Sequence, residues 1–131
     1  MSGEIAGLFY SVQLKEPVPR SACIELARQI VAADLPLRVE DETYPLHPKD
    51  QCMVDLRSVN LADELHVVVG SSPTEDRIFL HFQELRHGHM NAITPTAEDA
   101  ELASKIVALT QKRFPDAVIT QSHPHYGLLG P

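Results

Sequence analysis

The segment 64-ELHVVVGSSPTEDRIFLHFQE-84 contains the clearest secondary-structure pattern of this 131-residue chain. Residues 64–69 and 77–84 both alternate apolar with other side chains, which is the period of two that is typical of a strand with one buried face. The residues between them, 70–76, include glycine, serine and proline, which favour a loop. The segment therefore predicts two antiparallel strands that are joined as a hairpin and share one apolar face. The apolar positions are Leu65, Val67, Val69, Ile78, Leu80 and Phe82.

Four further strands and two helices are predicted around this hairpin. Residues 7–15 and 52–58 alternate in the same way, and residues 37–44 and 117–121 form shorter strands. The outer face of 37–44 is highly charged, which is typical of a sheet edge. Ser21 is expected to be the N-cap of a helix that continues to about residue 34, and Thr96 the N-cap of a helix that ends before Pro115. Residues 86–95 are expected to form a loop.

This order of elements, β-α-β-β-β-β-α-β, predicts an α+β fold. Each helix has one apolar stripe, so both are expected to pack on one face of a mixed, largely antiparallel sheet. The first strand–helix–strand unit and the last helix–strand unit could each supply a parallel strand pair. The chain shows no internal repeat or linker and its length suits one core, so residues 1–131 are expected to form a single α+β domain.

Composition and charge limit the classes of function. The chain has no run of about 18 apolar residues and no basic segment at its start, so neither a membrane helix nor a secretory signal is expected. Cys23 and Cys52 are expected to be reduced core thiols, and the protein is expected in the cytoplasm. A net charge of −7 disfavours direct contact with nucleic acid.

Acidic residues are concentrated between positions 34 and 64, where eight acids and three bases give a charge of −5. Such a surface attracts a basic protein and accelerates its association. Because the sequence contains no coherent catalytic set, we expect a small protein-binding module rather than an enzyme, of the kind found among immunity proteins and antitoxins that inhibit a toxin by contact. No cofactor is expected for this function. The residues expected at the interface are Glu40, Asp41, Glu42, Tyr44, Leu46, Asp50, Met53 and Asp55.

Two His-x-His pairs suggest the alternative, a metal-assisted hydrolase or small-ligand enzyme. Side chains two residues apart on an extended segment point the same way and can chelate one ion. If the last strand brings the two pairs together, about three imidazoles could bind a divalent metal such as zinc, with Glu84 as a base. A homo-oligomer formed by pairing of exposed edge strands is a third option. The four candidate metal ligands are His87, His89, His123 and His125.

Overall fold

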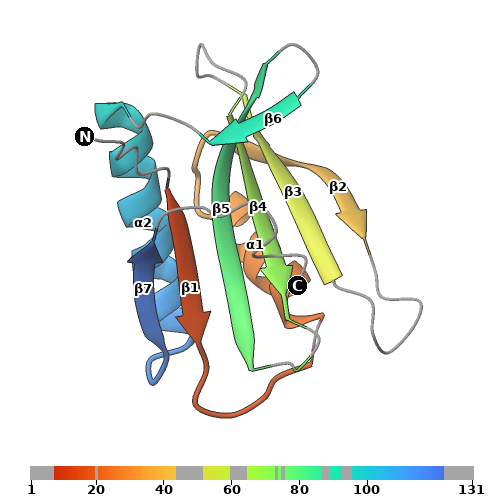
Figure 1. Ribbon diagram of the computed structural model, residues 1–131, viewed down its shortest axis with the longest axis vertical. Helices are drawn as coiled ribbons and strands as arrows, with labels where there is room; N and C mark the ends of the chain where they lie inside the picture. The colour runs from red at the N-terminus through yellow and green to blue at the C-terminus, as the bar shows by residue number, and fades with distance from the viewer. Residues whose placement is uncertain are drawn as a thin grey trace.

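A computed structural model describes residues 8–19, 21–43, 52–59, 65–72, 74, 76–86, 89–92 and 96–122 of the chain (Figure 1). The α+β class and the predicted order of elements are confirmed, and one short strand, β6, is added to that order. The elements are β1 (Phe9–Gln13), α1 (Ala22–Ala32), β2 (Leu37–Thr43), β3 (Cys52–Ser58), β4 (Leu65–Ser71), β5 (Arg77–Arg86), β6 (His89–Ala92), α2 (Ala97–Arg113) and β7 (Val118–Ser122).

The strands form one sheet in the order β2-β3-β4-β5-β1-β7, and β6 pairs with the C-terminal part of β5. Every pairing between the described strands is antiparallel, so the parallel pairs considered for the first and last units do not form among them. The path of the chain explains this result. The α1 helix connects β1 to β2 at the far edge of the sheet, and β7 returns beside β1 in the opposite direction (Figure 1).

The loop predicted over residues 86–95 is wrong for Arg86, which ends β5, and for residues 89–92, which form β6. This strand pairs with the end of β5 in a register that sets His89 opposite Arg86 and Ala92 opposite Gln83. A segment of four residues is too short to show a clear period of two. Its strand conformation comes from the tertiary pairing, which overrides local propensity.

Both helices cover the same face of the sheet, as predicted (Figure 1). Cys23 and Cys52 belong to this core as buried free thiols, again as predicted, and Sγ of Cys23 donates to the carbonyl oxygen of Cys52 over 3.3 Å. Burial raises the pKa of the Cys23 thiol, so this group stays protonated and is a poor nucleophile. The core between sheet and helices includes Val12, Leu26, Ile30, Val54, Leu56, Val67, Val69, Ile78, Leu80, Phe82, Ala103 and Ile106.

The two helices begin and end differently. Thr96 caps α2 as predicted, because its hydroxyl accepts from the backbone N–H of Asp99 and the Asp99 carboxylate accepts from the backbone N–H of Thr96. Ser21 stands at the N-cap position of α1, but its side chain makes no capping hydrogen bond. The α1 helix ends at Ala32, shortly before Asp34, whose positive φ of 62° does not continue a right-handed helix. Within the described ranges neither helix has the length and apolarity to cross a lipid bilayer.

Candidate functional site

The strand β2 carries three consecutive acids, Glu40, Asp41 and Glu42, which we call the acidic edge. Among the described strands β2 is the end of the sheet order and pairs with β3 alone. Glu40 and Asp41 are exposed, whereas Glu42 is half-buried and forms an ion pair with Arg28 of α1 at 3.5 Å. A register shift between Val39 and Asp41 marks a β-bulge. The bulge interrupts the alternation of side chains between the two faces, so successive residues are exposed. The acidic edge is therefore a solvent-facing surface.

The neighbouring strand β3 places two more of the predicted interface residues beside the acidic edge. In the β2–β3 register Met53 pairs with Thr43, and Asp55 pairs with Asp41. The five described members of the predicted interface thus lie on two adjacent strands at one side of the sheet. The remaining members lie outside the described residues, and their role stays a prediction: Tyr44, Leu46 and Asp50.

A histidine lies within hydrogen-bond distance of Asp55. Two carboxylates in directly opposite positions, as Asp41 and Asp55 are, repel each other across a strand pair. The Nδ1 atom of His66, on β4, lies 2.7 Å from Oδ1 of Asp55. A carboxylate oxygen accepts hydrogen bonds, so the proton of this contact is donated by Nδ1. The hydrogen bond gives Asp55 a partner whose side chain is buried in the sheet.

His66 and a second histidine, His81, form a buried cluster that the sequence analysis missed. Both lie on the sheet face opposite the helices, on adjacent strands, since His81 of β5 pairs with Val68, two residues from His66. His66 is 4% exposed and His81 is 6% exposed. The ring of Phe9 meets that of His81 edge to face, with centroids 5.0 Å apart. The alternation of strands β4 and β5 places both histidines on this face. It also predicts that the face is exposed to solvent, so the burial of His66 and His81 was not expected.

Three ring nitrogens in this cluster have no hydrogen-bond partner among the residues that the structure describes: Nε2 of His66 and both nitrogens of His81. Burial lowers the pKa of His81 to about 4, so this imidazole is neutral at neutral pH. A histidine whose Nδ1 is held by a carboxylate and whose Nε2 is free has the arrangement of a general base or of a metal ligand. In the described ranges, however, no three His, Cys, Asp or Glu side chains are grouped so that they could hold a metal ion. The described cluster offers buried hydrogen-bond acceptors without a complete metal-ligand set.

The predicted convergence of the two His-x-His pairs is not tested. His89 is the first residue of β6 and pairs with Arg86 of β5. The other three candidate ligands lie outside the described residues: His87, His123 and His125. A metal site that uses these four residues therefore stays a prediction.

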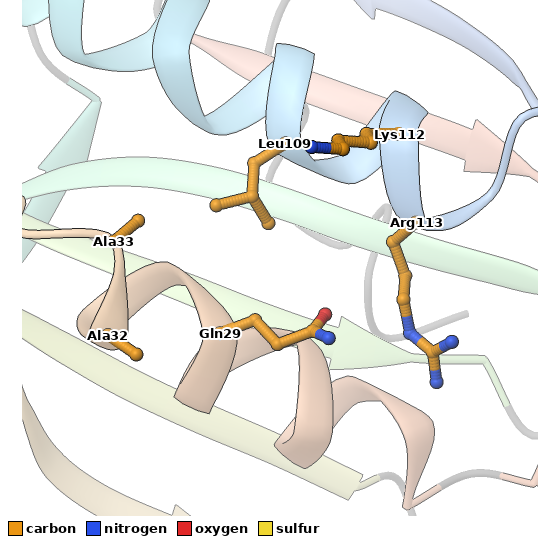
Figure 2. Close-up of a pocket in the computed structure, with 6 residues that line it drawn as sticks. All are labelled: Gln29, Ala32, Ala33, Leu109, Lys112 and Arg113. Carbon is orange, nitrogen blue, oxygen red and sulfur yellow. The ribbon is translucent and has the colours of Figure 1, made fainter.

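A groove of about 480 Å³ runs between the two helices, on the face of the molecule away from the sheet. Figure 2 shows Leu109 and Arg113 extending from α2 toward α1. Arg113 also forms an ion pair with Glu25 of α1 at 3.3 Å, and both side chains are substantially exposed. A wide groove with exposed charges and no buried titratable group is a weak setting for catalysis. Its lining residues are Gln29, Ala32, Ala33, Leu109, Lys112 and Arg113.

Comparison of the chain with protein-family models, with curated proteins and with solved structures gave no match. The functional argument therefore rests on the geometry. Of the surfaces described, the acidic edge and the adjoining part of β3 combine exposure, three consecutive acidic residues and a position at the end of the described sheet.

Proposed function

We propose that this chain is a protein-binding module that holds a basic partner against the acidic edge and the adjoining part of β3. The observation that carries the proposal is the exposure of Glu40 and Asp41 on the end strand of the described sheet. Such a strand offers a partner two kinds of contact at once. Its carboxylates attract cationic side chains, and the backbone groups along its outer side are available for hydrogen bonds.

The ion pair that Glu40 already makes is easily exchanged. Arg38 lies 3.7 Å from Glu40, and the two side chains are 60% and 39% exposed. An exposed ion pair contributes roughly 0–1 kcal/mol. A partner that brings its own arginines or lysines can therefore displace this pair at little cost.

Apolar contacts beside the acids would supply much of the affinity, because charge at the rim of an interface mainly raises the association rate and the specificity. Val39, next to Glu40, is 37% exposed, and Met53 on β3 is half-buried. Both could lose water when a partner binds. Tyr44 and Leu46, the other predicted anchors, follow β2 in the sequence.

The kind of partner follows from the charge. An acidic surface is complementary to a basic cleft, such as the active site of an enzyme that acts on nucleic acid or another polyanion. The module would then work in the cytoplasm as an inhibitor of the immunity or antitoxin type. It would act by occupying the cleft and would need no cofactor.

The test compares two variants that change the net charge equally. Glu40→Lys with Asp41→Lys reverses the acidic edge, and Glu98→Lys with Glu101→Lys reverses two exposed acids of α2. Each tagged protein is used to capture partners from a lysate of the source cells, and the captured protein is then titrated against each variant. We expect a basic protein in stoichiometric amount with the wild type and the α2 variant, and an affinity loss of at least about ten-fold for the acidic-edge variant.

Two results would contradict this proposal. One is the absence of any stoichiometric partner. The other is a partner whose affinity falls equally in both variants, because that would show a response to net charge rather than to the acidic edge.

A further inference from the structure

The strand β7, at the other end of the sheet from β2, has no charged residue. Its sequence is VITQS, and among the described strands it pairs with β1 alone. Val118 is 63% exposed, more than any other large apolar side chain in the described ranges. Thr120 and Gln121 are also exposed. The outer side of β7 is thus an uncharged strand edge of high β-propensity.

The two edges of the sheet differ in charge and in regularity, two features that govern strand pairing. β2 carries the acidic edge and a bulge, and a second copy docked there would place carboxylates near carboxylates. The described register of β7 with β1 is continuous over all five residues, with no bulge, and no charge opposes a second copy. The edge β2 is protected against self-association, whereas β7 is not.

We propose that β7 is the site at which two copies of this chain pair, antiparallel to each other across a two-fold axis. Two identical strands that run antiparallel form the same contacts twice, as a symmetric dimer requires. Full overlap of residues 118–122 places the axis at Thr120, opposite its own counterpart, and sets Val118 opposite position 122. This register gives Val118 of each copy a cross-strand neighbour at position 122 and forms one continuous sheet.

The distribution of charge favours this arrangement. Residues 96–122, which contain α2 and β7, have four acids and three bases, a charge of −1, against −5 for residues 34–64. Five strand spacings separate β7 from β2 in the sheet order, or about 24 Å at roughly 4.8 Å each. This distance exceeds the screening length of about 8 Å at physiological ionic strength. Pairing at β7 therefore keeps the two acidic edges apart and leaves both accessible. The dimer proposed here does not depend on the function proposed for the acidic edge.

Cross-linking tests the position of the axis. Directly opposite residues of an antiparallel pair have Cα atoms roughly 4.5–5.5 Å apart, which suits a disulfide. We expect Thr120→Cys to form a disulfide-linked dimer with oxidised glutathione. Val39→Cys, an exposed position on β2, is the matched control and should stay monomeric on a non-reducing gel. The native thiols of Cys23 and Cys52 are fully buried and do not compete.

Sedimentation velocity tests the association without a cross-link. We expect the wild type to form dimers in a concentration-dependent manner, and Thr120→Lys to raise the dissociation constant roughly five-fold or more, because it sets two cations opposite each other. Val39→Lys should leave the dissociation constant unchanged. A wild type that remains monomeric at every concentration would overturn the proposal. So would equal cross-linking of the two cysteine variants, or a dimer that Thr120→Lys does not weaken.

Discussion

Acid should destabilise this protein through His81, a buried residue of the central strand β5. This histidine is 6% exposed, and neither ring nitrogen has a hydrogen-bond partner within the described part of the chain. Phe9 and Phe79 lie on the same face of the sheet. On the same face, the nearest charged groups on the described strands are the Asp55–His66 pair and Arg57, on β3 and β4. Protonation of His81 would place a cation in a buried site where no described residue accepts a hydrogen bond from it, so the folded state resists protonation.

The magnitude follows from the pKa of His81, which burial lowers from an ordinary value of 6.5 to about 4. The folded state then binds the proton less readily than the unfolded state. Above about pH 6.5 both states are neutral at this position and His81 has no effect on the pH dependence. Below that value the unfolded state gains protons first, and stability is lost as the pH falls toward 4. The difference of about 2.5 pKa units corresponds to about 3 kcal/mol.

Urea unfolding, followed by circular dichroism between about pH 7 and pH 4, measures this loss. Carboxylates also contribute to the pH dependence, so the quantity of interest is the difference between His81→Phe and the wild type. Phenylalanine keeps an aromatic ring against Phe9 but does not titrate. We expect the variant to gain stability over the wild type progressively below about pH 6.5, by about 3 kcal/mol near pH 4.

An NMR titration of the His81 ring gives an independent reading. A midpoint near 6.5, or a stability difference between His81→Phe and wild type that does not change with pH, would refute the reasoning. Either result would mean that water or a neighbouring hydrogen-bond acceptor stabilises the protonated ring in the folded state.

Three further measurements test the fold and the alternative function. Asp55→Ala removes the acceptor for Nδ1 of His66 and should lower the free energy of unfolding by about 1–3 kcal/mol, with unchanged stability contradicting the assigned hydrogen bond. Ile106→Ala in the core should cost about 2–5 kcal/mol, whereas Val118→Ala at the exposed edge should cost less than about 0.5 kcal/mol, and similar losses would mean that α2 is wrongly placed. Protein purified without a histidine tag should contain no stoichiometric zinc, and added zinc should leave the melting temperature unchanged; stoichiometric metal would instead favour the hydrolase that uses the two His-x-His pairs.

The faces of the strands and the caps of the second helix were predictable because they depend on local periods and local hydrogen bonds. Leu65, Val67 and Val69 point to the core as the alternation predicts, and Thr96 caps α2 as its type and position predict. The order of the strands was not predictable. The insertion of β1 between β5 and β7 depends on pairings between residues about 70 and 110 positions apart, which no local pattern records.

The sequence predicted the exposed acidic residues of the candidate site but not its buried histidines. The exposure of Glu40 and Asp41 follows from a run of charges on a short strand, and the sequence contains that run. The cluster of His66 and His81 was missed for a different reason. Period-two alternation assigns both residues to the face away from the helices, but it gives no information about whether that face is covered.

The acids of β2 have two possible roles, protection of an edge and recognition of a partner, and the sign of the charge separates them. Any charge keeps strand edges of two copies apart, and lysine is the residue most often used for this purpose. Recognition of a basic partner requires negative charge. The Glu40→Lys and Asp41→Lys variant should therefore stay as soluble and as resistant to aggregation as the wild type while it loses its partner. Replacement of the same two residues by valine should remove both properties. If the lysine variant retains the partner and only the valine variant fails, the acids protect the edge and the binding surface lies elsewhere.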